Sequence, residues 1–536
     1  MKRTWLTLIT VVLLFVTALS GCKGGKKEEE TTQTSTTQTT ITETTSKAET
    51  QSQEETTEKQ PVYGGEITVG IQQDIDSLDP HKAVAAGTKE ILFNVYEGLV
   101  KPDENGNLVP AIAEDVVISE DGCEYTFPIR EGIQFHDGST VTAEDVVYSL
   151  KRVAGLLDET DPSVVVDSAF SHVTEISAED NVVKIVLSAA NTELLGYLTC
   201  AIIPAGNTTC DKTPIGTGPY KVASYQALEK VVLSKNTNYW GEEPYLDTVT
   251  FKIVADSDTA TTQLLAGSID VYAYLTYDQA AELEGKFRIE EGSMGLVQGI
   301  FLNNESKLFS DERVRQAINY AVDRQGVLDM IANGKGAVIA TDMFPSFGTY
   351  YNDETEEVYP HDPAKAIELL KQAGYPNGIS FEMIVPSGYE YHINTAQVII
   401  DQLKEANINV KMQKVDDSSW LKDVYQDRNY EASLYGLAAK VVVPSRVLSR
   451  YASTASNNFI NYKNAEYDEI LAKAIASIDD HEKQELYKQL EAMLTEDAAS
   501  VYLQDPALLV AVNPELEGYK FYPIFVQDVA SLHYMQ

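Results

Sequence analysis

The fold of this chain is decided by the stretch from Tyr125 to Val146, which reads YTFPIREGIQFHDGSTVTAEDV. Its first apolar residues, including Phe127 and Ile129, alternate with polar ones, as in a strand with one buried face. After an Asp-Gly turn, the hydroxyl of Thr142 can accept a hydrogen bond from the backbone N–H three residues later and so begin a helix. A strand, a turn and a capped helix in direct succession predict an α/β fold.

The same two patterns alternate through the rest of the chain from Pro61 onward, with no short repeat period. Expected strands have β-branched and aromatic residues, and expected helices have apolar residues at helical spacing. Strands are predicted at 66–71, 249–254 and 269–274, and helices at 88–99, 258–265, from 311 onward, 364–373, 395–405 and 465–494, the last in two pieces. Mixed sheets and more than one lobe follow from this alternation.

Six shorter strings accompany the decisive stretch in a fixed order: YEGLV (96–100), LVPAIAE (108–114), IGTGPY (215–220), NTNYW (236–240), RVRQAI (313–318) and YAVDR (320–324). Together they resemble the solute-binding proteins of ABC importers, family 5, the group of oligopeptide, dipeptide and nickel binders. The resemblance extends from about residue 64 to the C-terminus. It is specific for the family and not for the ligand.

The resemblance implies a two-lobed periplasmic-binding-protein-like fold with mixed sheets and an extra domain in the first lobe. Crossing strands would join the lobes, which would close on a ligand by a hinge motion. The implied segments are 61–98, 214–302 and 495–536 for the main domain of lobe 1, 99–213 for its accessory domain, and 303–494 for lobe 2.

In function, the resemblance implies capture of an extracellular oligopeptide or peptide-like solute and its delivery to an ABC permease with its ATPase subunits. The protein would be a monomer, perform no chemistry and need no cofactor. An oligosaccharide or an anionic ligand is the alternative within the same fold. A surface hydrolase is disfavoured, because the sequence offers no nucleophile–base pair and no histidine pair at metal-ligand spacing.

Charge and composition narrow the partners further. The chain has 41 Lys and Arg against 81 Asp and Glu, a net charge of −40. Phosphate binding depends on Lys and Arg, so a nucleic-acid partner is excluded. The pair His136-Asp137 and the glycines Gly216 and Gly218 resemble a catalytic pair and a phosphate loop, but both are more typical of backbone turns.

The N-terminal segment is predicted to be a targeting device. Lys2 and Arg3 precede an apolar run that is too short to span a bilayer, so residues 1–21 are expected to be a signal peptide. The sequence before Cys22 resembles a bacterial lipoprotein box, which implies lipidation of that cysteine. Residues 22–60 are rich in Thr, Glu and Gln and are predicted to be a disordered tether. The folded part would then lie on the outer face of the cytoplasmic membrane, held by lipid.

Two interpretations of the remaining cysteines stand at this point. Cys200 and Cys210 flank a short loop, and in an oxidising exterior a disulfide between them would add about 2–3 kcal/mol. The alternative is a pair of buried thiols. Cys123 would have no partner in either case.

Peptide-binding members of the family carry a Gly-Trp-x-Ala-Asp segment whose aspartate holds the ammonium group of the peptide. The matching stretch here begins at Gly436 and continues through Leu437, Ala438 and Ala439 to Lys440, so the tryptophan and the aspartate are both replaced. If Lys440 faces the ligand, it would attract an anion and repel an ammonium group. If it does not, Asp416 or Asp417 is the local substitute for an amine anchor.

Other ligand contacts are expected from position within the resemblance. The strand at 269–274 would edge the ligand site, which makes Tyr272 or Tyr274 a contact, and a glycine-containing loop before a helix presents further tyrosines. The candidate ligand residues are Ala85, Ala86, Tyr272, Tyr274, Tyr389, Tyr391, Gly436, Leu437, Ala438 and Lys440. For each tyrosine, ordinary packing is the alternative.

Overall fold

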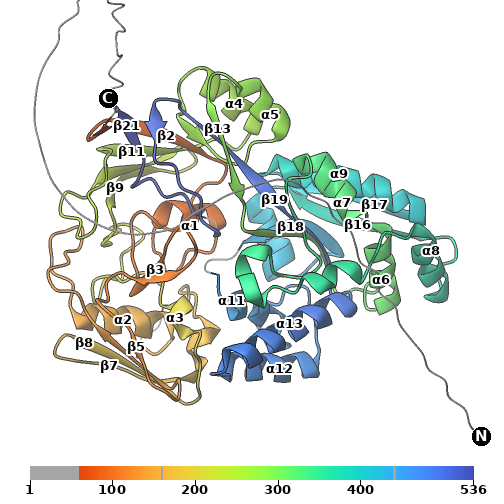
Figure 1. Cartoon of the computed structure of the whole chain (residues 1–536), viewed down its shortest axis with the longest axis horizontal. Helices are drawn as coiled ribbons and strands as arrows, with labels where there is room; N and C mark the ends of the chain where they lie inside the picture. Colours follow the sequence, from red (N-terminus) through yellow and green to blue (C-terminus); the bar gives the residue numbers. More distant parts are fainter. Residues whose placement is uncertain (1–59, 159–160, 439–441, 525) are drawn as a thin grey trace, which may run out of the picture. The chain divides into compact units, whose positions relative to one another are not determined.

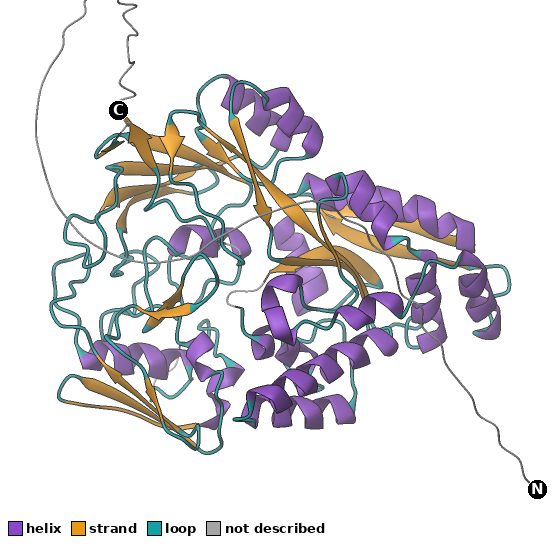
Figure 2. Ribbon diagram, viewed as in Figure 1, coloured by secondary structure: helices purple, strands orange, loops and turns teal. Residues whose placement is uncertain are grey.

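The computed structural model describes residues 60–158, 161–438, 442–524 and 526–536. The predicted signal peptide, the lipidated Cys22 and nearly all of the tether lie outside the described residues. Residues 59–536 form one compact unit (Figures 1 and 2). None of the helices in the described ranges is long and apolar enough to cross a membrane.

A twelve-stranded sheet connects two lobes and confirms the predicted mixed α/β class. Neighbouring strands in it are both parallel and antiparallel. Its order is β17 (Ile408–Val415), β16 (Ile379–Pro386), β18 (Ala432–Ala438), β14 (Leu296–Leu302), β19 (Val501–Val512), β12 (Val271–Tyr272), β2 (Glu66–Ile71), β11 (Thr248–Ile253), β10 (Lys230–Lys235) and β9 (Tyr220–Gln226). We call the part of the molecule that contains β17, β16, β18 and β14 lobe 2, and the part that contains β12, β2, β11, β10 and β9 lobe 1.

Strand β19, the long blue strand in Figure 1, belongs to both lobes. Its first half pairs with β14 and with β15 (Gly336–Val338), and its second half pairs with β12 and with β13 (Arg288–Ser293). The second crossing connection runs from β13 to β14 through Gly295, whose φ of +64° suits glycine. The two lobes are therefore joined by two adjacent crossing strands.

Helices cover the sheet in both lobes (Figure 2). In lobe 2, apolar faces pack into two large cores that contain Phe301 and Ile318, respectively. The lobe 2 helices are α6 (Glu312–Ala321), α7 (Arg324–Ala332), α8 (Pro363–Gln372), α9 (Glu390–Leu403), α10 (Asp417–Trp420), α11 (Pro444–Leu448), α12 (Ala465–Ala476) and α13 (Asp480–Glu496). Lobe 1 has α1 (Ala86–Leu92), α4 (Ser257–Leu265) and α5 (Tyr277–Leu283).

A smaller sheet forms the accessory part of lobe 1 and has its own core. Its strands are β5 (Val117–Ile118), β6 (Glu124–Pro128), β8 (Val182–Leu187) and β7 (Val173–Glu179), accompanied by α2 (Ala143–Val153) and α3 (Leu194–Tyr197). The predicted start of α2 is confirmed, because Thr142 and Asp145 form a reciprocal capping box. Tyr125 and Phe127 are fully buried on the predicted face of β6. Short ribbons β3 (Val100–Pro102) with β4 (Leu108–Pro110), and β1 (Pro61–Val62) with β21 (His533–Met535) and β20 (Leu516–Glu517), complete the strands.

Three predicted elements differ in length from the observed ones. The helix expected at 88–99 is α1 and ends at Leu92, because the backbone after it turns to accept hydrogen bonds from Gly218 and Tyr220. The strand expected at 269–274 is reduced to the two residues of β12. The helix expected at 395–405 begins five residues earlier, at Glu390.

The loop at 216–220 is a close backbone contact, as its glycines suggested. A Cβ atom at Gly216 would lie 2.1 Å from the carbonyl oxygen of Val95, so only glycine fits there. The His136 ring holds the same loop: its Nδ1 accepts from the N–H of Gly216 and its Nε2 lies 3.1 Å from the Gly218 oxygen. Burial lowers the pKa of His136 to about 4, which keeps the ring neutral in this structural role.

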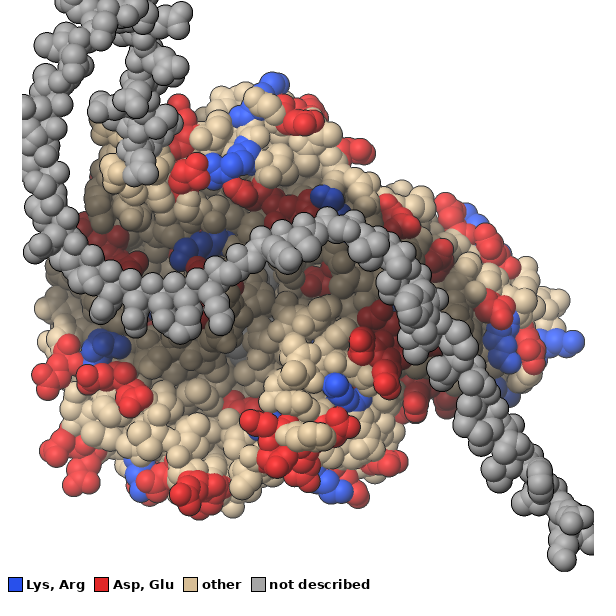
Figure 3. Space-filling view, in the orientation of Figure 1, with Lys and Arg blue, Asp and Glu red and all other residues tan. Residues whose placement is uncertain are grey.

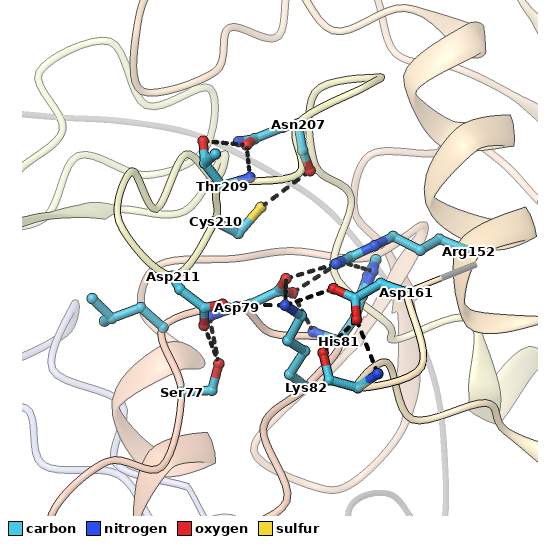
Figure 4. Close-up of polar contacts among 12 residues, drawn as sticks. Ser77, Asp79, His81, Lys82, Arg152, Asp161, Asn207, Thr209, Cys210 and Asp211 are labelled. Atoms are coloured by element: carbon cyan, nitrogen blue, oxygen red, sulfur yellow. Dashed lines mark hydrogen bonds and ion pairs between the residues drawn. The ribbon is translucent and has the colours of Figure 1, made fainter. Parts of the chain in front are cut away.

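A buried polar network ties the accessory part to the main domain of lobe 1 (Figure 4). Arg152 of α2 binds Asp79 through two hydrogen bonds, of 2.9 and 2.7 Å, and its Nη1 lies 3.0 Å from Nδ1 of His81. Asp79 has no exposed surface. Lys82 at the edge pairs with Asp161 at 2.8 Å.

The structure has no disulfide between Cys200 and Cys210; Cys210 is buried, as the alternative expected, whereas Cys200 is only partly buried. The two side chains pack into different cores: Cys200 against that of the accessory part, and Cys210 within that of the main domain. The Cys210 sulfur lies 3.8 Å from the carbonyl oxygen of Asn207 (Figure 4).

Candidate functional site

Three of the candidate tyrosines meet where the lobes join. Tyr274 comes from lobe 1, just after β12, whereas Tyr389 and Tyr391 come from the start of α9 in lobe 2. The ring centroids of Tyr274 and Tyr389 are 5.5 Å apart, and those of Tyr389 and Tyr391 are 5.7 Å apart. All three belong to one buried core. We call these three residues the tyrosine cluster.

Tyr274 has an unusual backbone, with φ of 66°. A large side chain rarely adopts this left-handed conformation, which costs on the order of 1–3 kcal/mol and is concentrated at functional sites. The ring of Tyr274 contacts that of Tyr389 in lobe 2. Tyr272, by contrast, packs with Leu509 in a separate core, where its hydroxyl accepts a hydrogen bond of 3.0 Å from Gln72.

The other described candidate residues lie at the start of α1 and at the end of β18. Ala85 is the N-cap of α1 and Ala86 its first residue. Gly436, Leu437 and Ala438 end β18 and pair with β14, and of these only Ala438 packs against the core of the tyrosine cluster. Lys440 and Ala439 lie outside the described residues.

Glu90 of α1 is a carboxylate that we did not predict. It is only 3% exposed and accepts hydrogen bonds from the side chains of Gln527 and Tyr274. Burial raises the pKa of Glu90 to about 8. Its charge in turn contributes, after burial, to the raised pKa values of Tyr389 and Tyr391 across the lobe boundary. Glu90 therefore lies at the tyrosine cluster.

The structure distinguishes Asp416 from Asp417. Asp416 caps α10 by accepting hydrogen bonds from the N–H and hydroxyl of Ser419, at 2.9 and 2.6 Å. Asp417 turns toward lobe 1 instead, where it accepts a hydrogen bond from Gln73. Its Oδ1 is shielded from solvent and has no hydrogen-bond partner among the described residues. Burial raises the pKa of Asp417 to about 6.

A chain of neutral groups connects the cluster to both crossing strands. The rings of Tyr391 and His392 are 4.2 Å apart, and Nδ1 of His392 lies 2.8 Å from the amide nitrogen of Gln298 on β14. The Gln298 oxygen accepts a 2.7 Å hydrogen bond from Gln504 on β19. Burial lowers the pKa of His392 to about 3, so the ring is neutral and brings no positive charge.

A pocket of about 330 Å³ opens between the lobes beside the cluster. Its charged lining is entirely acidic: Asp256, Asp258, Asp278 and Glu282 from lobe 1, and Glu390 from lobe 2. Gly388, also in the lining, lies against the Asp417 carboxylate, because a Cβ there would be 2.3 Å from its Oδ2. Elsewhere, Figure 3 shows Asp and Glu scattered over the visible face with Lys and Arg among them.

A second contact between the lobes lies at the accessory part, which faces α11 and α13 in Figure 1. Glu193 accepts hydrogen bonds from the N–H of Ser445 and the hydroxyl of Tyr487, at 3.1 and 2.9 Å. Arg446 pairs with Asp167 and lies 4.2 Å from the ring centroid of Tyr197. We call these six residues the accessory contact.

Asp505 of β19 holds the two crossing strands together where they change lobes. Its carboxylate accepts hydrogen bonds from the hydroxyl of Ser293 and the N–H of Leu296, on either side of Gly295, at 3.0 and 3.1 Å. Burial raises the pKa of Asp505 to about 7.

This pKa predicts a pH dependence of stability. Because the folded-state pKa lies above the usual value near 3.9, the contribution of Asp505 is present in acid and is lost as pH rises through about 7. We expect the free energy of unfolding of the wild type, minus that of Asp505→Asn, to be lower at pH 8 than at pH 5 by at least about 1 kcal/mol. Urea unfolding of both proteins at the two pH values measures this, and a constant difference would contradict it.

In the described ranges, no group of three or more His, Cys, Asp or Glu residues could hold a metal ion. The sequence analysis did not propose Glu90 as a site residue, because it predicted the helix from the spacing of apolar residues alone. The polar residues Glu90, Asn94 and Glu97 follow at helical spacing and are all buried, and this pattern was the available signal. Asp417 was named, but only the structure separates it from its neighbour.

Comparison with known proteins agrees with this geometry. A model of the bacterial extracellular solute-binding proteins, family 5 (middle part), matches residues 107–459. The chain is 26% identical to the oligopeptide-binding protein AppA of Bacillus subtilis over 97% of both proteins. It is 28% identical to the glutathione-binding protein GsiB of Escherichia coli, covering 85% of this chain and 92% of that one. The solved structure of DppA from Helicobacter pylori in complex with the peptide STSA matches with a TM-score of 0.80 at 26% identity, covering 89% of this chain and 99% of that one.

Proposed function

The chain belongs to family 5 of the bacterial extracellular solute-binding proteins, and from this premise we propose that its solute is a peptide or peptide-like molecule bound at the tyrosine cluster. Solute capture for an ABC importer is the function of the family. The observation that carries the finer proposal is a buried aromatic cluster assembled from both lobes next to the crossing strands. Aromatic rings supply contact area for side chains, and their hydroxyls supply polar contacts to a peptide backbone.

The relatives support a peptide over a sugar. One relative is named for oligopeptides and another for glutathione, and one matching structure holds a tetrapeptide. We further propose that the bound protein hands its solute to a permease, acts as a monomer without catalysis, and is held at the outer face of the membrane by a lipid on Cys22. The lobe segments implied by the resemblance remain part of this proposal.

Binding of a peptide should close the lobes and stabilise the fold. The experiment uses the full chain, freed of co-purified solute by denaturation and refolding, and a pool of tetrapeptides. We expect the melting temperature to rise with peptide concentration, because only the native state binds, and the radius of gyration in X-ray scattering to fall. Mass spectrometry of the released solute should identify a peptide. A sugar in that fraction, or a new reaction product, would contradict the proposal.

A further inference from the structure

A second pocket, of about 350 Å³, lies against the crossing strands. We propose that this pocket, which we call the hinge pocket, is the space into which the two lobes rotate when they open, so that filling it holds the lobes closed. The inference rests on the proposed function only for the solute used in part of its test.

The walls of the hinge pocket come from both sides of the crossing. One wall is residues 291–293 of β13, which pairs with the lobe 1 half of β19. The opposite wall is Gly336 and Ala337 of β15, which pairs with the lobe 2 half, together with residues 345–346, which lie between two phenylalanines of a lobe 2 core. The middle strand, β19, supplies Asp505 and Ala507 as the floor.

The alternation of side chains along β19 places the hinge pocket and the tyrosine cluster on opposite faces. Leu508 and Val510 belong to the core that contains the tyrosine cluster, whereas Asp505 and Ala507 line the hinge pocket. Successive side chains of a strand point to opposite faces. The pairing of β19 with β13 from Ala507 to Val512 has no register shift, so the alternation is unbroken there. The hinge pocket therefore lies behind the crossing strands as seen from the tyrosine cluster.

Opening changes these two faces in opposite directions. The rings of Tyr274 and Tyr389, one from each lobe, are 5.5 Å apart and must separate for a solute to enter between them. If the lobes rotate about the crossing strands, separation on the tyrosine face brings the lobes together on the other face. Packed lobes move as bodies and compress little. Rotation therefore requires free space behind the strands, and the hinge pocket supplies it.

The contacts around the hinge pocket leave its two walls free to approach each other. Glu291 of β13 pairs with Lys335, just before β15, at 2.6 Å across the rim. Both side chains are exposed, so this ion pair is weak and does not fix the distance between the walls. The Asp505 carboxylate is bound to Ser293 and to the backbone of the crossing connection, which keeps the floor in place. Solvent can leave the pocket as the walls approach, whereas a large side chain on the floor cannot.

The size of the side chain at position 507 should therefore set the balance between open and closed lobes. In this structure the lobes touch at the tyrosine cluster and at the accessory contact, so the hinge pocket has its closed-state volume. A larger side chain at Ala507 would fit that volume but would meet the walls on opening. Because the apparent affinity depends on the fraction of closed protein, such a change should tighten binding without touching the solute.

The test adds bulk to the hinge pocket of the full-length protein, freed of co-purified solute. Ala507→Phe should lower the radius of gyration of the solute-free protein in X-ray scattering toward that of peptide-bound wild type. It should also tighten binding of the tetrapeptide pool at least about fivefold in calorimetry. Ser346→Phe, on the lobe 2 wall, should act in the same direction. The matched control is Ala223→Phe, at an exposed position of the edge strand β9, which should change neither quantity.

A smaller substitution keeps the test decisive if Ala507→Phe disturbs folding, which melting curves would reveal. Ala507→Cys hardly changes the pocket, and N-ethylmaleimide then adds bulk at that position after folding, with treated wild type as the control for the native cysteines. The modified protein should show the same fall in the radius of gyration. Because opening narrows the hinge pocket, peptide should speed the reaction of this cysteine, as followed by mass spectrometry, rather than protect it.

An unchanged or larger radius of gyration in folded Ala507→Phe, or in the modified cysteine variant, would overturn the role of the hinge pocket. Slower reaction of the cysteine in the presence of bound peptide would overturn it as well. Failure of the tetrapeptide pool to bind wild type would instead reject the proposed function, and scattering of the solute-free proteins would still decide on the hinge pocket.

Discussion

Replacing Arg152 with methionine is expected to lower the free energy of unfolding by about 3–5 kcal/mol, the largest loss that we expect from one substitution here. The guanidinium makes two hydrogen bonds to Asp79, which is completely buried. Without it, the nearest cation is Lys82, whose Nζ lies 3.9 Å from the carboxylate. In the wild type, burial lowers the pKa of the adjacent His81 to about 4, and the charge of Arg152 contributes to that lowering. Equilibrium unfolding in urea measures the change.

Two variants make this expectation specific to a buried pair. Arg313→Met removes an arginine whose side chain is 48% exposed and paired with Asp311, and should cost no more than about 1 kcal/mol. The double variant Arg152→Met with Asp79→Leu removes both buried charges and should recover much of the loss. A loss of 1 kcal/mol or less in Arg152→Met alone would show that water or a local shift solvates Asp79.

Replacing Arg446 with methionine is expected to weaken solute binding about 10- to 50-fold without any contact to the solute. Arg446 joins lobe 2 to the accessory part by an ion pair with Asp167 and by stacking on Tyr197. Such charged contacts contribute about 2 kcal/mol when partly buried. Because the accessory contact exists only when the lobes are together, its loss lowers the closed population and with it the apparent affinity.

Calorimetry with the tetrapeptide pool, and scattering without peptide, test this expectation. The matched control is Lys463→Met, which removes an exposed ion pair with Glu305 within lobe 2 and should leave both quantities unchanged. If Arg446→Met lowers the melting temperature but not the affinity, the accessory contact stabilises the fold and not the closed state.

Periodicity and turn chemistry predicted the scaffold well because they are local. Strand β2 has the expected bounds, and the hydroxyl of Thr142 caps α2 as expected. The errors arise where distant backbone takes over. Helix α1 ends early because its next carbonyl oxygens accept hydrogen bonds from residues more than 120 positions later. The cysteines stay apart because each belongs to a different core, which spacing along the chain does not reveal.

The candidate site was less predictable because it is assembled from separate segments. Position within the family resemblance selected Tyr274, Tyr389 and Tyr391, and the structure brings those three together. Tyr272 is two residues from Tyr274 and was an equal candidate, but it belongs to a different core, which also contains Leu509. Glu90 becomes a candidate site residue only because it is buried beside residues such as Gln527, more than 400 positions away in the sequence. No local pattern could therefore identify its surroundings.

The position of β19 in the sheet has a consequence for the order in which the chain can fold during synthesis. Residues 501–512 form the strand between β14 and β12, and all the other strands of the large sheet precede them in the sequence. Until the ribosome has passed that segment, the partial sheets of the two lobes each have an open edge and share no strand. The nascent chain therefore cannot reach its final core early. A central strand that is synthesised last delays folding of the large sheet. Such a delay suits a polypeptide that must cross a membrane in extended form before it folds.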